Sequence, residues 1–181
     1  MPTSEVFLAP CANEASRNYL KKSVLGSVPK KVYGQYTDKE FGDSVAIWGV
    51  EEGELEASWE KINRGDYLLF YTGNSPIRSP TSKTYEYAAR VRSTEENHGL
   101  SKELWRRYSG TAGLGSTSRG PWPYVIYLSE PVSIGVQNQD IQEYADYSVN
   151  FNPQRFMPYG GNEKIRQEFG SIENFIQKST I

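Results

Sequence analysis

The sequence Tyr-Leu-Leu-Phe-Tyr at residues 67–71 constrains the fold most, because it is a continuous apolar run of only five residues. Asp66 precedes the run, and a turn cluster, Thr-Gly-Asn-Ser-Pro, follows it at 72–76. A short apolar run without alternation is typical of a strand that is buried on both faces. The sequence therefore predicts that residues 67–71 form the centre of a sheet.

Further strands are predicted on both sides of this segment. Tyr85, Tyr87 and Val91 fall on alternate positions, which indicates a return strand that pairs with 67–71 as a hairpin. Short apolar runs predict other strands at residues 6–9, 44–50, 124–128 and 134–136. Residues 27–41 lack clear periodicity, so we expect a loop there with one short strand at 31–33.

Helical signals separate these strands. Asn13 is placed to cap a helix at 14–24. Leu55, Trp59 and Ile62 recur at helical spacing within 51–63, which predicts that Trp59 is a core residue. Three more short helices are predicted: one capped by Ser101 that carries Trp105, one that ends before Gly170, and one capped by Ser171.

The order of these elements predicts the fold class. Strands and helices alternate without a strict βαβ rhythm, which favours an α+β fold over a Rossmann arrangement. We expect a single domain over residues 1–181, built on a curved mixed sheet or small barrel with flanking helices. We expect the C-terminal helices, at about 162–178, to close one end of this domain. A Gly-, Ser- and Thr-rich stretch at 109–120 reads as a flexible loop, and 137–159 shows few periodic signals.

Composition excludes several classes of protein. One cysteine, Cys11, rules out an internal disulfide, and together with the single His98 it cannot build the usual zinc sites. We therefore expect neither a transition-metal enzyme nor a cofactor. The apolar runs are too short to span a bilayer, and we expect a cytoplasmic protein. A net charge of −2 argues against coating of nucleic acid by bulk electrostatics, but it allows a local basic patch.

Aromatic residues make up 13% of the chain, with thirteen Tyr and four Trp. Nucleobases stack on protein surfaces that are formed by flat, amphipathic aromatic rings. For any one ring taken alone, burial in the core is the simpler interpretation.

The order of the elements also carries a resemblance. The run Ser-Val-Ala-Ile-Trp-Gly at 44–49 is followed by an acidic amphipathic helix. Then come Gly-Asp-Tyr-Leu-Leu-Phe-Tyr at 65–71 and a hairpin return that ends Ala-Ala-Arg-Val at 88–91. Over roughly residues 5–135 this order resembles the EVE and YTH branch of PUA-like domains. YTH domains bind N6-methyladenine, and related domains at the N-terminus of McrB-type restriction subunits recognise methylated DNA bases.

The resemblance implies a set of residues that bind the base. Trp48 holds the place of the tryptophan that forms one wall of the methyl-base cage, and Trp105 or Trp122 offers the second wall. Groups that read the base edge would lie near Cys11, Asn13 and Gly49, where Gly49 offers only its backbone and Cys11 replaces an amide. Tyr71, at the end of the central strand, is a further candidate ring. A tryptophan at a strand end is also often a lid on the core, and that reading stays open.

Polar residues near these rings are candidates for contact with the nucleic-acid backbone. Asn74, Ser75 and Arg78 follow the central strand and are placed to touch sugar or phosphate, although turn chemistry alone is the favoured explanation of such residues. Lys83 and Arg119 belong to a discontinuous set of basic residues that would form a rim for the phosphates, or else a solvated surface.

Taken together, these features predict a non-catalytic reader of a methylated base in DNA, with N6-methyladenine favoured and 5-methylcytosine next. By the resemblance, it would be the specificity domain of a McrBC-like restriction system, fused to or working with an AAA+ motor and a nuclease subunit. Three alternatives remain: an RNA-binding PUA-like module, a nuclease domain and a protein-interaction domain. The nuclease lacks support, because Glu86 is followed by Tyr and Ala rather than by the x-Lys of a metal-dependent nuclease motif.

Overall fold

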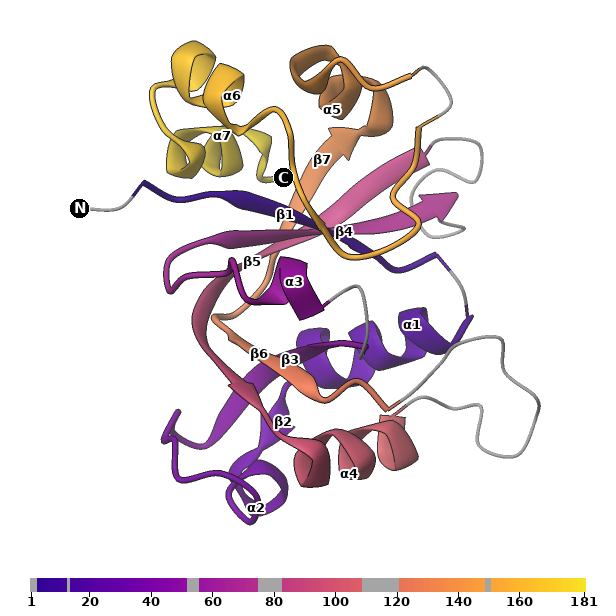
Figure 1. Cartoon of the computed structure of the whole chain (residues 1–181), viewed down its shortest axis with the longest axis vertical. Coiled ribbons are helices and arrows are strands. Elements are labelled where there is room, and N and C mark those ends of the chain that lie inside the picture. Colours follow the sequence, from indigo (N-terminus) through magenta and orange to yellow (C-terminus); the bar gives the residue numbers. More distant parts are fainter. Residues whose placement is uncertain (1–2, 13, 52–55, 75–82, 109–120, 149–150) are drawn as a thin grey trace. The chain divides into compact units, whose positions relative to one another are not determined.

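The computed structural model describes residues 3–12, 14–51, 56–74, 83–108, 121–148 and 151–181. The chain divides into two compact units (Figure 1). Unit 1 comprises Met1–Ala12, Gly65–Ala89 and Val132–Ile181. Unit 2 comprises Asn13–Arg64 and Arg90–Pro131. The long strand β5 (Lys83–Glu96) contributes its first half to unit 1 and its second half to unit 2.

Unit 1 is built on a mixed sheet in the order β7-β5-β4-β1-β8. Its other strands are β1 (Val6–Pro10), β4 (Tyr67–Asn74), β7 (Val132–Gln137) and β8 (Met157–Pro158). β1 runs parallel to β4, with Val6 opposite Tyr67, whereas β8 and β7 pair antiparallel with β1 and β5. Leu68, Leu69 and Phe70 of β4 are completely buried. The prediction that 67–71 forms the centre of a sheet is confirmed.

Three helices pack on the sheet of unit 1, namely α5 (Asn138–Ala145), α6 (Asn162–Phe169) and α7 (Ile172–Ser179) (Figure 1). Ile141, Ile165 and Ile176 insert from them into one buried apolar cluster. The Ser171 hydroxyl accepts the backbone N–H of Asn174 at 3.0 Å and caps α7 as predicted. The predicted C-terminal helices are therefore confirmed, whereas α5 was missed, because Ile141 is its only fully buried apolar side chain.

Unit 2 contains an antiparallel sheet in the order β2-β3-β6-β5. Its strands, besides the second half of β5, are β2 (Val28–Pro29), β3 (Ser44–Val50) and β6 (Tyr124–Leu128). Its helices are α1 (Glu14–Tyr19), the π-helix η1 (Leu20–Leu25), α2 (Lys30–Tyr33), α3 (Glu56–Trp59) and α4 (His98–Tyr108). Ser23 anchors η1 to the sheet, because its hydroxyl lies 2.8 Å from the carbonyl oxygen of Ile47.

Several local predictions for unit 2 were wrong. Residues 31–33 lie in helix α2 rather than in a strand, because Val28 and Pro29 already make the short pairing with β3. Ser101 is buried inside α4 and does not cap it. The cap is Asn97, whose side-chain oxygen accepts the backbone N–H of Leu100 at 2.9 Å.

The helix predicted over 14–24 begins as expected, but it changes to a π-helix after Tyr19. Within 51–63, the part of the chain that the structure describes is helical only at Glu56–Trp59. Asn13 and the Gly-rich stretch at 109–120 lie outside the described residues. The predicted α+β class with a mixed sheet and flanking helices is confirmed, whereas a single domain over 1–181 stays a prediction.

Candidate nucleic-acid interface

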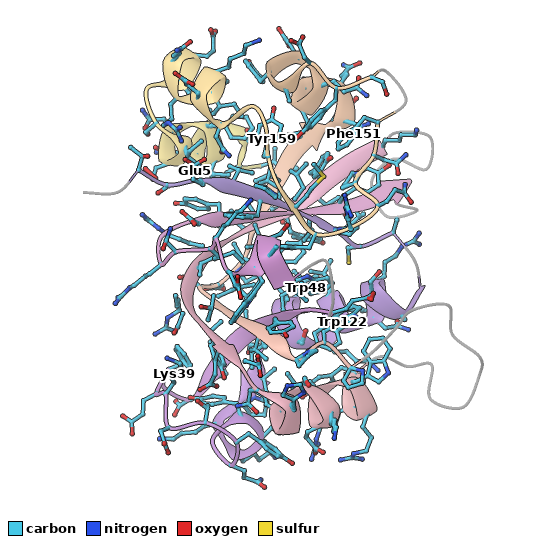
Figure 2. The ribbon with its side chains drawn as sticks, in the orientation of Figure 1. Glu5, Lys39, Trp48, Trp122, Phe151 and Tyr159 are labelled. Carbon is cyan, nitrogen blue, oxygen red and sulfur yellow. The ribbon has the colours of Figure 1, made fainter. Side chains whose placement is uncertain are left out.

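Four aromatic side chains of unit 2 meet in one cluster, which we call the aromatic cluster. It consists of Tyr19 at the end of α1, Trp48 in β3, Trp105 in α4, and Trp122 just before β6. The ring of Trp122 has its centroid 5.3 Å from that of Trp48, and 5.0 Å from those of Trp105 and Tyr19. Figure 2 shows the side chains of Trp48 and Trp122 beside each other. The structure thus brings together the three tryptophans singled out in the sequence.

Gly49 is the reason that Trp122 can come so close to β3. A Cβ atom on residue 49 would lie 2.7 Å from the Cβ atom of Trp122 and 2.8 Å from its carbonyl oxygen. Such distances are too short for any side chain, so only glycine permits this approach of the two backbones. The geometry gives Gly49 a packing role, and the predicted contact of its backbone with a base stays a prediction.

Burial differs sharply among the four rings. Tyr19, Trp48 and Trp122 are 2%, 3% and 8% exposed, whereas Trp105 is half-buried. Burial, and secondarily Tyr108, raises the pKa of the Tyr19 phenol far above its usual value. The phenol therefore stays neutral at physiological pH, and the cluster is an uncharged, largely dry environment of the kind that strengthens stacking.

The separations between the rings correspond to direct contact. Centroids about 4.5–7 Å apart are the preferred geometry of touching aromatic pairs. A base between two parallel rings needs them about 7 Å apart, which is two contact distances of about 3.5 Å. At 5.0 and 5.3 Å the neighbours of Trp122 leave no such gap. In this conformation no base can lie between Trp122 and these two neighbours.

Two tryptophans of unit 2 differ in how their indole N–H groups are satisfied. Trp59 Nε1 donates to the carbonyl oxygen of Val125 at 3.3 Å, and its ring packs on that of Tyr124. Trp59 thus makes structural contacts, but it is half-buried and not the core residue that its helical spacing predicted. Trp122 Nε1 is buried and has no hydrogen-bond partner among the residues that the structure describes. An unpaired buried donor costs about 1–3 kcal/mol.

The other predicted base-binding residues that the structure describes lie in unit 1. Cys11 is buried, and its backbone N–H donates to the carbonyl oxygen of Tyr71 at 2.8 Å. The ring of Tyr71 lies 5.1 Å from that of Tyr85, and burial raises the pKa of the Tyr71 phenol. Both residues therefore have structural contacts within unit 1, and their role in binding stays a prediction.

The predicted backbone-binding residues are only partly described. Asn13, Ser75, Arg78 and Arg119 lie outside the described residues, and Asn74 is described only as the last residue of β4. Lys83 is exposed at the start of β5. It lines an open cavity of about 420 Å³ in unit 1, together with Gln137, Asn138, Gln139 and Gln142. Ammonium and amide groups of this kind donate hydrogen bonds to phosphate and sugar oxygens.

Sequence reasoning missed two features of these sites. Tyr19 was not singled out, although it follows Ala15 by four residues and thus falls on the same buried face of α1. The amide-rich lining of the cavity was missed too, although Gln-Asn-Gln at 137–139 and Gln142 are close together in the sequence.

Among the residues that the structure describes, no helix is long and apolar enough to cross a membrane. In the same part of the chain, no three His, Cys, Asp or Glu side chains gather in a way that would hold a metal ion.

Comparison with known proteins supports the fold. No protein-family model matches the chain, and no curated protein matches its sequence. Among solved structures, it is similar to the N-terminal domain of Thermococcus gammatolerans McrB bound to m5C DNA. The TM-score is 0.64 at 17% identity, over 96% of this chain and 99% of that domain. The chain has the EVE/YTH-like fold of PUA-like domains.

Two further structures resemble the chain less closely. Human THYN1, solved in complex with DNA that contains 5-methylcytosine, gives a TM-score of 0.50 at 11% identity, over 91% of this chain and 97% of that one. The YTH domain of Mmi1 in complex with RNA gives a TM-score of 0.46 at 12% identity, over 98% of this chain and 84% of that one. At such identities the likeness concerns the fold, and the role of each site residue stays a prediction.

Proposed function

We propose that this chain is a non-catalytic reader of a methylated base in DNA, which it binds in the aromatic cluster of unit 2. The observation that carries the proposal is the meeting of Tyr19, Trp48, Trp105 and Trp122 in one cluster from four separate segments. The sequence resemblance favours N6-methyladenine. Two proteins of similar fold were solved with DNA that carries 5-methylcytosine, so that base is the other principal candidate.

Stacking supplies the binding energy that base flipping requires. Extruding a base from a duplex costs a few kcal/mol. Stacking of the base on aromatic rings returns about 1–3 kcal/mol per base. One methyl group contributes only about 0.8 kcal/mol when buried. Preference for the methylated base therefore requires a tight pocket without water, and the largely buried rings of Trp48 and Trp122 would line such a pocket once Trp105 has moved.

A base can bind only after one ring of the aromatic cluster has moved aside. Trp105 is the half-buried member, and the ring that has most of its surface in water loses least when it moves. Leu100 and Leu104, both fully buried, hold α4 in place while the Trp105 side chain changes its rotamer. The incoming base then stacks on the displaced ring of Trp105 and lies next to Trp122.

The proposal extends to the setting in which the reader works. A module without catalytic groups of its own changes DNA only through a partner, so we propose that it directs an AAA+ motor and a nuclease of a McrBC-like restriction system. In line with this, the chain alone should not cleave methylated duplex when Mg²⁺ is supplied. Cleavage by the purified chain would contradict the non-catalytic role.

The first experiment is a fluorescence-anisotropy titration at fixed salt against matched duplexes that carry adenine, N6-methyladenine, cytosine or 5-methylcytosine, repeated with RNA. We expect tighter binding to one methylated duplex than to its unmodified counterpart. Equal affinity for all duplexes would refute the reader function. Stronger binding to RNA, through contacts with the 2′-hydroxyl groups, would favour the RNA-binding alternative.

A pair of tryptophan variants connects that preference to the aromatic cluster. Trp105→Ala removes one stacking ring and should weaken binding of the methylated duplex about 5- to 150-fold, which corresponds to about 1–3 kcal/mol. Trp59→Ala is the matched control, because Trp59 is also half-buried in unit 2 but packs on Tyr124. If both variants keep the preference, the base binds elsewhere.

A further inference from the structure

The indole nitrogen of Trp122 is a buried donor without an acceptor among the described residues. Trp122 is 8% exposed, and its ring is surrounded by Tyr19, Trp48 and Trp105. Burying an N–H group removes its hydrogen bond to water, and folding normally supplies a replacement. The group is therefore an unsatisfied donor inside the candidate binding site.

Trp59 shows that unit 2 can supply a hydrogen-bond acceptor to an indole N–H group when the side chain has only a structural role. Trp59 is more exposed than Trp122, yet its Nε1–H donates to the carbonyl oxygen of Val125. The more deeply buried indole would gain more from a partner, because water cannot replace one. The unsatisfied group thus belongs to a ring of the aromatic cluster, in which the proposed ligand would bind.

The ring angles favour an edge contact. The planes of Trp105 and Trp122 meet at 61°, and those of Trp48 and Trp122 at 49°. A base that lies flat on Trp105 or Trp48 adopts the plane of that ring, so it meets Trp122 steeply rather than face to face. The Trp105–Trp122 pair is T-shaped, so that one ring presents its edge to the other, whereas the Trp48–Trp122 pair is tilted. The Nε1–H group lies on the edge of the Trp122 indole.

We propose that Trp122 Nε1–H donates a hydrogen bond to an acceptor on the flipped base, either a ring nitrogen or a carbonyl oxygen. This assignment rests on the proposed function. The assignment gives the rings of the aromatic cluster different roles: Trp105 and Trp48 supply stacking faces, and Trp122 contacts the base edge. It also restricts the ligand, because an apolar protein side chain would leave the donor unpaired, whereas every nucleobase carries acceptors.

The test replaces the N–H group without removing the ring. β-(3-Benzothienyl)alanine has the shape of tryptophan but carries sulfur in place of N–H, and it would be introduced at position 122 and, as the matched control, at position 59. Without DNA, the variant at 122 should be as stable as the wild type or more stable, because it loses only an unpaired donor. The variant at 59 should be less stable, because it loses the bond to Val125.

Binding provides the second measurement, with the 5-methylcytosine and N6-methyladenine duplexes as probes. The variant at 122 should bind the duplex that the wild type prefers about tenfold more weakly, and the variant at 59 should bind as the wild type does. In NMR spectra, the indole N–H proton of Trp122 should move downfield when that duplex is added, whereas that of Trp59 should stay in place.

The possible failures are distinguishable. If the wild type prefers a methylated duplex and the variant at 122 binds it equally well, the hydrogen bond is absent and only this assignment fails. If the variant at 122 loses as much stability as the variant at 59, the donor is already paired in the free protein, which also overturns the assignment. If the wild type prefers no methylated duplex, the reader function fails, and this assignment fails with it.

Discussion

Gly49→Ala tests whether the close approach of β3 to Trp122 holds the aromatic cluster together. The added Cβ atom would lie 2.7 Å from the Cβ atom of Trp122 and 2.8 Å from its carbonyl oxygen. Carbon atoms in favourable contact are about 3.5–4.0 Å apart, so the two segments would have to separate by roughly 0.8 Å or more. Rotation of a side chain cannot relieve these contacts, because they involve the backbone oxygen and the first side-chain carbon.

The size of the effect follows from two opposing contributions. Overpacking in a buried site costs about 1–3 kcal/mol of unfolding free energy. Replacing glycine also lowers the conformational entropy of the unfolded chain, which raises the free energy of unfolding by about 0.4–1 kcal/mol. At the middle of each range the net loss is about 1.3 kcal/mol, which lowers the Tm of a chain of this length by about 3–5 °C. Because Trp122 is displaced, the preference for the methylated duplex should weaken in the same variant.

Thermal unfolding followed by circular dichroism measures the loss, with Gly135→Ala as the matched control. Gly135 also lies within a strand, β7, but its added Cβ atom would be 3.5 Å from the nearest atom, a methyl carbon of Ile181. That is an ordinary contact, so the control should stay within about 0.5 kcal/mol of the wild type. Equal Tm values for the two variants would refute the packing role of Gly49.

Three further measurements test other parts of the structure. Lys83→Ala should weaken binding of methylated and unmodified duplexes equally and lower the salt slope by about 1, and a change in base preference would contradict a phosphate contact. Ser171→Ala should cost about 1 kcal/mol in chemical denaturation, since it removes the cap of α7, and an unchanged midpoint would show that the cap is unimportant. Burial raises the pKa values of Tyr19 and Tyr85 above that of the unfolded chain, so their stabilising effect is complete below about pH 10 and is lost at higher pH. Tyrosinate absorbance should therefore appear together with unfolding, and full ionisation of all tyrosines in the folded protein would contradict this burial.

Local patterns were sufficient for most strands and for the final helices. The apolar run at 67–71 and the segment 44–50 became strands β4 and β3 because their residues are buried in the sheets. Ser171 capped α7 because the cap is formed within four residues of sequence. The helix α5 was missed because its pattern is weak. The start of α4 was predicted wrongly because two nearby residues, Asn97 and Ser101, could each cap it.

The sequence predicted which residues belong to the candidate site better than it predicted how they contact one another. The resemblance pointed to Trp48, Trp105 and Trp122. It did not reveal that these rings contact one another, that Tyr19 joins them, or that one indole N–H is unpaired. Each of these facts depends on residues far apart in the chain, whose distances no local pattern contains.

The sequence by itself therefore determined the α+β class, the central strand and the tryptophans worth testing, because periodicity, caps and turn residues act over a few neighbours. Only the tertiary structure decided how those tryptophans are arranged. Gly49 illustrates the difference: in the sequence it is a small residue after a tryptophan, and in the fold it is the point where the backbone at Trp122 packs against β3. Packing at that distance is a property of two segments together, and the pairing of β3 with β6 brings them together.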